Sequence, residues 1–356
     1  MNGDAVAHDR APITVKSAVE EYLVVREKEE RARKGGAGLK RDAWSRLRHA
    51  LSEPLAAKTL NELSEDDLKS WRSALASKAA KGWNGDTLSE TSIRRTVNDL
   101  KAALNAAAER YRAKLPATLP IVIRIGLKVP KVKATVARPK QVLPDADVRA
   151  IVDAAAKIDA KGDWGGDLSR MVLVLAATGA RFSQVIRLTV ADVQAKQSRI
   201  MMPVSHKGRG EKAATHIAVR VGEDVIKALQ PIQSGRKGNE VLLLRPHWRQ
   251  LGPVKRELVG RAPWLSASRL LDPWAAILAK AELASDLVPY ALRHSSIVRG
   301  LRAGLPIRLV AALHDASSAM IERHYAAYIV DAMDELAARA VVSLVTPAPS
   351  PIKAVS

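Results

Sequence analysis

The sequence predicts a mainly α-helical protein with a small β-sheet, an α+β fold divided into two domains. Apolar residues recur at helical spacing through most of the 356-residue chain. Two short runs, 199–204 and 215–219, have the composition of strands, and a glycine-containing turn separates them. A basic, proline-containing segment interrupts the helical pattern near residue 130, and we place the boundary between the domains there.

The first domain, residues 14–123, is predicted as a small all-helical domain, preceded by a disordered N-terminus at residues 1–13. Its third helix begins at Ser64, a good N-cap residue that is followed by acids in the first turn. Its fourth helix begins at Ser89 and places Val97 and Leu104 on one apolar face. The four predicted helices span about 17–25, 40–51, 64–75 and 89–104.

Residues 124–142 form the predicted basic linker. Between Arg124 and Lys140 there are six basic residues and no acid, together with two prolines that favour an extended path. The segment is either a solvated hinge or a hinge that also lies along phosphates, and the lack of acids favours the second interpretation. The basic residues are Arg124, Lys128, Lys131, Lys133, Arg138 and Lys140.

The second domain, residues 143–345, begins where Asp145 can cap a helix. An apolar helix ends at Gly179, and the two strands follow with Lys207 in the turn between them. A Pro/Ser-rich segment at 346–356 is expected to be a flexible tail. The predicted helices span about 145–155, 167–177, 248–260, 273–283, 292–303, 307–313 and 318–338.

Composition limits the classes of partner. The net charge of +20 indicates a polyanion, most often nucleic acid. A membrane surface is less favoured, because the chain has no basic amphipathic helix with an aromatic face and no apolar run near the ~20 residues of a bilayer span. The polar N-terminus is not a secretory signal, and the lack of cysteine excludes disulfides and cysteine zinc sites. We expect a cytoplasmic protein that does not associate with membranes.

Aromatic residues are scarce, with one Phe, five Tyr and seven Trp. Proteins that bind single strands need exposed rings at intervals, so this scarcity favours binding to a duplex backbone. The tyrosines Tyr290, Tyr325 and Tyr328 fall in the C-terminal fifth of the chain, among arginines and histidines.

The most informative stretch is Ile-Glu-Arg-His-Tyr at 321–325, which ends eleven residues after His314. Arg293 and Arg181 lie upstream. Guanidinium groups can hold phosphate oxygens in bidentate fashion and stay charged at any relevant pH. A tyrosine hydroxyl such as that of Tyr325 can attack the phosphorus and carry the broken strand covalently. These residues can therefore cut a phosphodiester without a metal or another cofactor.

These residues resemble the tyrosine recombinase (phage integrase) family, and the resemblance covers nearly the whole chain. Its strongest parts are Thr-Gly-Ala-Arg at 178–181, Leu-Arg-His-Ser at 292–295 and Ser-Ser-Ala-Met-Ile-Glu-Arg-His-Tyr at 317–325, with a Lys-Gly hairpin between the first and second. The resemblance implies that 14–123 is a core DNA-binding domain and that 143–345 is a catalytic domain.

The resemblance also assigns roles to individual residues. In the family two arginines bind the scissile phosphate, and Arg181 and Arg293 match those positions. Lys207 matches the mobile lysine that would protonate the departing 5′ oxygen, with Lys212 as the competing candidate.

His314 matches the second histidine position, a hydrogen-bond donor to the phosphate. Tyr325 matches the nucleophile, and Tyr328, three residues on, is the fallback.

Three features depart from the family pattern. Tyr290 stands where the family usually has a histidine, and a phenol is a poorer base near pH 7. Gln184 stands where an acid usually follows the first arginine by three residues. Leu313 replaces the glycine before His314, and the interval from His314 to Tyr325 is about one residue longer than expected.

The resemblance implies a site-specific recombinase that cleaves and rejoins double-stranded DNA through a 3′-phosphotyrosyl intermediate, without ATP, metal or cofactor. It also implies a homotetramer assembled on paired DNA sites. A type IB topoisomerase-like enzyme and a catalytically weakened DNA-binding protein on the same scaffold are the alternatives. The expected DNA contacts outside the catalytic site are Arg94, Arg95, Lys128, Lys131 and Lys133.

Overall fold

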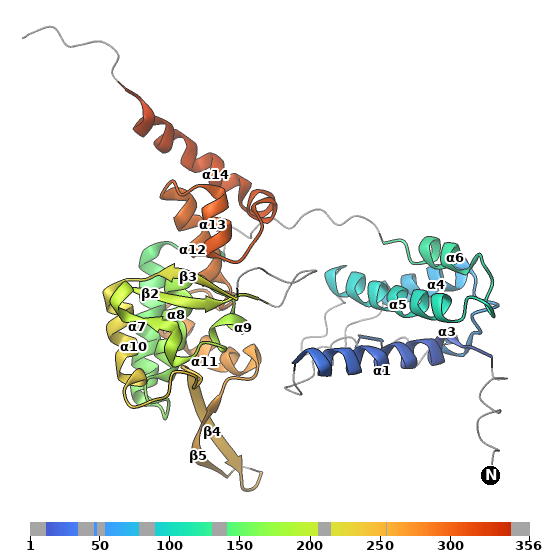
Figure 1. Cartoon of the computed structure of the whole chain (residues 1–356), viewed down its shortest axis with the longest axis horizontal. Helices are drawn as coiled ribbons and strands as arrows, with labels where there is room; N and C mark the ends of the chain where they lie inside the picture. Colours follow the sequence, from blue (N-terminus) through green and yellow to red (C-terminus); the bar gives the residue numbers. More distant parts are fainter. Residues whose placement is uncertain are drawn as a thin grey trace, which may run out of the picture. The chain divides into compact units, whose positions relative to one another are not determined.

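The computed structural model describes residues 12–34, 46–47, 54–77, 90–129, 141–205, 215–253 and 255–342. It confirms a mainly helical α+β fold. The chain divides into two compact units, residues 1–133 and 134–356 (Figure 1). Among the described residues, the first unit is built from helices and all the strands belong to the second.

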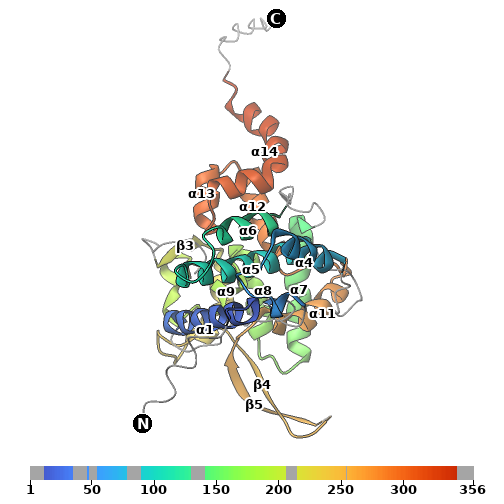
Figure 2. The same cartoon turned by 90° about the vertical axis from the view of Figure 1, so that its right-hand side faces the viewer.

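The first unit has a compact apolar core. Helix α1 packs along α5, and α6 packs against α4 and α5 (Figure 2). Val19, Leu68, Leu100, Leu104 and Ile123 are fully buried between these helices. The helices are α1 (Val15–Lys34), α3 (Pro54–Ala57), α4 (Glu65–Ser77), α5 (Glu90–Arg110) and α6 (Leu119–Gly126).

Helix α6 differs from the predicted extended linker, because Arg124 lies inside it. Pro120 stands in the first turn, where its missing N–H costs nothing. Gly126 brings the end of the helix close to α4, since a Cβ there would lie 2.6 Å from Leu68 Cβ. Burial of this short apolar helix outweighs the extended preference of its β-branched residues.

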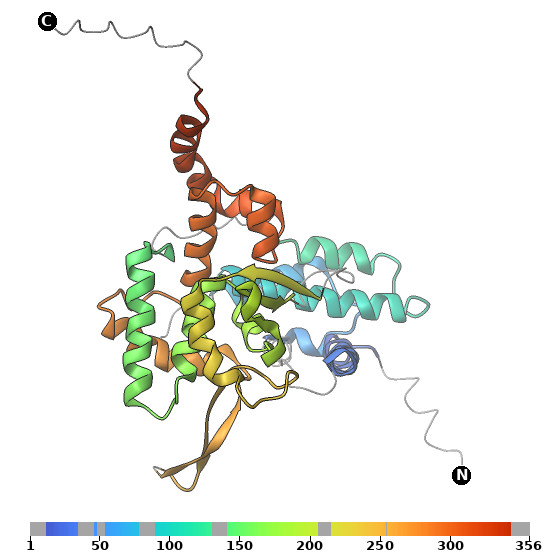
Figure 3. The same ribbon diagram turned by 60° about the vertical axis from the view of Figure 1, so that its left-hand side comes forward.

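The second unit is built around α8. Met171, Val172 and Val174 are fully buried, and α8 packs against α7, α10 and α12 (Figure 3). A three-stranded antiparallel sheet has the order β1-β2-β3. Its strands are β1 (Val193–Gln194), β2 (Arg199–Pro203) and β3 (His216–Arg220). The helices are α7 (Asp145–Lys161), α8 (Asp167–Thr178), α9 (Phe182–Val185), α10 (Glu223–Gln233), α11 (Leu271–Lys280), α12 (Ala291–Arg302), α13 (Ile307–Leu313) and α14 (Ser318–Ala340).

The two predicted strands are confirmed as β2 and β3, which pair in antiparallel fashion with Ile200 opposite Val219. Both of these side chains are buried against the helices. The turn that would carry Lys207 lies outside the described residues, as do 1–11, Lys131, Lys133 and the predicted tail at 346–356.

The predicted helix at 248–260 is wrong. This segment belongs to an antiparallel hairpin of β4 (Leu244–Gln250) and β5 (Arg256–Pro263). Gly252 and Pro253 stand between the strands, and a proline there would break a helix. Trp248 pairs with Leu258 across the strands, and the Arg256 guanidinium lies 4.8 Å from the centre of its ring. The hairpin projects from the unit on the side away from α13 and α14 (Figures 1 and 3).

The last three predicted helices are confirmed as α12, α13 and α14. Helix α14 departs from helical backbone angles at Tyr325, where φ is −124° and ψ is 16°. Within the described part of the chain, no helix combines the length and the apolar character that a membrane crossing requires.

Candidate active site

Two arginines from distant parts of the chain meet at the turn between α13 and α14. Arg181 follows the glycine that ends α8, and Arg293 lies in the first turn of α12. Arg293 Nη2 donates to the carbonyl oxygen of His314 at 2.5 Å, and Arg181 Nη1 donates to that of Asp315 at 3.0 Å. The two guanidinium groups are therefore held by consecutive carbonyls of one turn.

Arg293 is an unusually buried cation, with 1% of its surface exposed. Its Nη1 donates to the carbonyl of Gly179 at 2.9 Å, whereas its Nε has no hydrogen-bond partner in the described part of the chain. Burial lowers the pKa of Arg293, and the nearby charge of Arg181 lowers it further, but a guanidinium remains charged near neutral pH. A buried cation of this kind is stabilised by an anion that enters the site.

His314 is buried beneath the two arginines. Its Nδ1 lies 2.8 Å from the carbonyl oxygen of Val310, which can only accept, so Nδ1 carries the proton. Burial lowers the pKa of His314 to about 4, which leaves the ring neutral at pH 7. Its Nε2 then accepts from the Ser296 hydroxyl at 2.9 Å. The neutral ring has no further N–H, so Nε2 can donate to a phosphate only after the ring takes up a second proton. A nearby anion favours this protonation.

Tyr325 is 2% exposed, and its hydroxyl lies 2.7 Å from Nδ1 of His294. Burial raises the pKa of the Tyr325 phenol above its ordinary value, and the charge of Arg293 opposes this rise only in part. The phenol therefore stays protonated at neutral pH and needs a proton acceptor before it can attack.

The imidazole of His294 contacts the Tyr325 hydroxyl through Nδ1. Burial, together with the charges of Arg293 and His324, lowers the pKa of His294 to about 4. The ring is neutral at pH 7 and can present a lone pair at Nδ1 to Tyr325. Sequence reasoning missed this residue, although its position directly after Arg293 was a usable signal.

Tyr290, which stands where the family usually has a histidine, lies at the mouth of the site. The residue is 43% exposed, and its ring centre lies 5.8 Å from Cζ of Arg293 and 5.0 Å from that of His294, edge-on. Tyr328 lies farther along α14, with its ring centre 6.5 Å from that of Tyr325. The structure thus brings together Arg181, Arg293, His314, Tyr290 and Tyr325, while Lys207 and Lys212 lie outside the described residues.

Gln184 is 1% exposed and lies under Arg181. Its side-chain oxygen accepts from the backbone N–H of Arg181 at 3.0 Å, and its Nε2 donates to the carbonyl of Pro203 at 2.8 Å. Both ends of the neutral amide are used, which explains why glutamine fits this position. Among the described residues, no group of three or more His, Cys, Asp or Glu could hold a metal ion.

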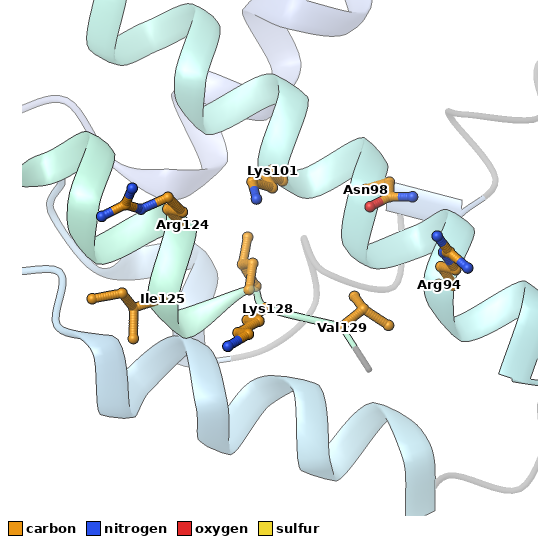
Figure 4. Close-up of a pocket in the computed structure, with 8 residues that line it drawn as sticks. Arg94, Asn98, Lys101, Arg124, Ile125, Lys128 and Val129 are labelled. Atoms are coloured by element: carbon orange, nitrogen blue, oxygen red, sulfur yellow. The ribbon is translucent and has the colours of Figure 1, made fainter. Parts of the chain in front are cut away.

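A second group of predicted residues lies on the first unit. Arg94 and Lys128 line an open pocket of about 490 Å³ together with Lys101 and Arg124, which come from α5 and α6 (Figure 4). Of the described residues, four cations and no acid line this pocket. Arg95 is exposed on α5 but is not among the lining residues, and Lys131 and Lys133 lie outside the described residues.

Comparison with known proteins gives a consistent family match. Residues 141–329 match the Phage integrase family. The Tn1549 transposon integrase in complex with a circular intermediate DNA is similar in fold, with 17% identity over 92% of this chain and 100% of that one, and a TM-score of 0.61. The same integrase in complex with transposon right end DNA has 17% identity, coverage of 91% and 100%, and a TM-score of 0.59. The XerH site-specific recombinase bound to palindromic difH substrate has 17% identity, coverage of 84% and 78%, and a TM-score of 0.51. No curated protein matches the chain.

Proposed function

Because the chain belongs to the phage integrase family, we propose that it is a site-specific recombinase that cleaves and rejoins duplex DNA through a 3′-phosphotyrosyl intermediate. One observation carries this proposal: Arg181 and Arg293 converge on the turn between α13 and α14, and the charge of Arg293 acts on the Tyr325 phenol, whose hydroxyl contacts His294. Transition-state charge develops on the non-bridging oxygens of the phosphate, and fixed cationic donors in a dry site stabilise it strongly.

The proposed reaction uses this chain's own groups. The scissile phosphate enters beside Arg293, whose Nε has no hydrogen-bond partner among the described residues, and takes further hydrogen bonds from Arg181. Tyr325 attacks the phosphorus and gives its proton to Nδ1 of His294, while the 5′ oxygen leaves with a proton for which Lys207 is the proposed donor. The phosphotyrosyl bond replaces the phosphodiester bond, so the energy for rejoining is conserved and ATP is not needed.

The depressed pKa of His294 predicts an unusual pH profile. A histidine base loses its lone pair below its pKa, so the cleavage rate falls as pH falls through that value. The groups that face the His294 ring are Arg293, His324, Tyr290 and Tyr325. Because the pKa of His294 is about 4, kcat/KM should stay flat from pH 8 to about pH 5. With an ordinary histidine as the base, it would fall as the pH passes through about 6.5. Single-turnover cleavage at subsaturating DNA measures this.

His294→Gln can still hydrogen bond to Tyr325 but cannot take its proton. It should lower the rate by about 10²-fold at every pH tested. An unchanged rate in this variant would show that another group accepts the proton.

The basic pocket of the first unit is the proposed duplex-backbone contact. Lys101 and Arg124 place their charges beside those of Arg94 and Lys128, and no acid in the described part of the chain lines the pocket to neutralise them (Figure 4). That the similar structures described above were determined with DNA supports the same partner class.

This contact can be checked by the salt dependence of DNA binding. Lys101→Ala and Arg124→Ala should each reduce the slope of log K against log salt by about 1, with little change in sequence preference. Lys69→Ala on α4 is the matched control, because Glu65 and Asp66 already neutralise that amine. An unaltered slope in both pocket variants would remove the pocket from the DNA interface.

Recombination exchanges strands between two duplexes and so requires four cleavages. We therefore propose a homotetramer assembled on paired DNA sites.

The direct test of function uses a nicked suicide duplex, in which the fragment released by cleavage diffuses away and the covalent adduct accumulates. Incubation in EDTA should give a protein–DNA adduct, and peptide mapping should place it on Tyr325. Binding without an adduct would instead support a non-catalytic DNA-binding protein. Relaxation of supercoiled DNA without strand exchange between sites would favour a type IB topoisomerase-like enzyme.

A further inference from the structure

Asp315 contacts Arg181 and two of the residues around it, Gln184 and Ser205. Its carboxylate oxygen Oδ2 accepts from the backbone N–H of Ser205 at 2.7 Å and lies 3.3 Å from Arg181 Nη1. Gln184 Nε2 lies 3.4 Å from the same oxygen. The carbonyl oxygen of Asp315 accepts from Arg181 Nη1 as well, at 3.0 Å.

The backbone of Asp315 is also unusual. Its φ is +48°, in the left-handed region, which non-glycine residues rarely adopt although aspartate is among the more tolerant. Only about a tenth of its side chain is exposed, against 17% for Arg181. Burial of the carboxylate and the left-handed backbone both cost free energy of folding, and the contacts of Asp315 with Arg181 and Ser205 offset that cost.

Gln184 is a neutral neighbour of this carboxylate. The position three residues after Arg181 holds a neutral amide, which uses its oxygen on the Arg181 backbone and its nitrogen on Pro203. It therefore supplies no charge to the Arg181 side chain. The negative charge comes instead from the turn that follows His314.

We propose that Asp315 is the positioning residue for Arg181, and that its carboxylate replaces, from the turn between α13 and α14, the charge that Gln184 lacks. Asp315 joins Arg181, the segment after β2 at Ser205 and the turn between α13 and α14. It thereby fixes the orientation in which the Arg181 guanidinium faces the phosphate. This inference rests on the proposed function, because its catalytic effect requires that Arg181 bind the scissile phosphate.

The test is a double-mutant cycle between Arg181→Lys and Asp315→Asn. Asn keeps the size of the side chain and one oxygen that can accept from Ser205, whereas it removes the charge and replaces the other carboxylate oxygen by an NH2 donor. At saturating suicide duplex, Asp315→Asn should lower the cleavage rate on the order of 10²-fold, while DNA affinity changes less than about threefold. If Asp315 acts through Arg181, the double variant should be about as slow as Arg181→Lys alone.

Asp192→Asn is the matched control, since Asp192 is similarly buried but caps the turn at Thr189. Its effect on the rate should multiply with that of Arg181→Lys. Independent, multiplying effects of Asp315→Asn and Arg181→Lys on cleavage would overturn the inference, as would an unchanged rate in Asp315→Asn.

A cycle measured without DNA separates this failure from failure of the function. The unfolding midpoints of the same variants should also be non-additive if the two side chains interact, whether or not the protein cleaves DNA. A wild-type chain that forms no adduct overturns the proposed function and the inference with it. A wild-type adduct with additive variants overturns the inference alone.

Discussion

Replacing Tyr325 by phenylalanine is expected to abolish the covalent adduct, with cleavage falling by at least about 10³-fold. The change removes only the hydroxyl that would attack the phosphorus, and the ring still fills its buried position beside His294. Loss of this one hydrogen bond should cost about 1 kcal/mol of unfolding free energy. Trapping on a suicide duplex measures cleavage, and DNA affinity should be retained because the arginines are untouched.

Tyr328→Phe is the comparison that identifies the nucleophile. Tyr328 lies one turn farther along α14, with its ring centre 6.5 Å from that of Tyr325. The adduct should persist in Tyr328→Phe. If it persists in Tyr325→Phe and disappears in Tyr328→Phe, the attacking group is Tyr328.

The helical framework could be predicted because its apolar periodicity is local. Helix α13, for example, has the predicted bounds, and β2 and β3 lie where the two strand-like runs were found. The segment at 248–260 could not be assigned in this way. The β4–β5 hairpin depends on cross-strand packing, such as Trp248 against Leu258, and on a turn at Gly252 and Pro253.

Helix α6 shows the same limit. Its β-branched residues favour an extended chain, yet Leu119 and Ile123 are buried in the core of the first unit. The contact that allows this burial, Gly126 against Leu68, joins residues almost sixty positions apart. Periodicity within one segment contains no information on such a contact.

The candidate site divides in a similar way. Arg181, Arg293 and Tyr325 stand in motifs whose order along the chain indicates a phosphodiester chemistry. Asp315 has no such mark, and His294 is marked only by its place next to Arg293. Their roles depend on the side chains that the fold brings close to them, Tyr325 at 2.7 Å and Arg181 at 3.3 Å. The glutamine at 184 indicated that something was missing, and only the structure shows which carboxylate lies beside Arg181.

The second large effect is expected from Gly179→Ala. Gly179 ends α8 with φ +59°, and a Cβ there would lie 2.6 Å from Cβ and Oγ of Ser296 and 2.8 Å from Nε2 of His314. The left-handed backbone should cost about 1–2 kcal/mol and the crowding about 1–3 kcal/mol more. Cleavage should also fall, because the carbonyl of Gly179 holds Arg293 and the displaced groups surround the proposed phosphate site.

Gly235→Ala separates the two costs. Gly235 has a similar φ of +73°, but a Cβ there would meet nothing within 4 Å. This variant should therefore lose only the backbone contribution, about 1–2 kcal/mol, and keep its cleavage rate. Urea unfolding of both variants gives the difference, which measures how tightly α8 is packed against Ser296 and His314. Equal losses in the two variants would mean that this close approach imposes no constraint on the site.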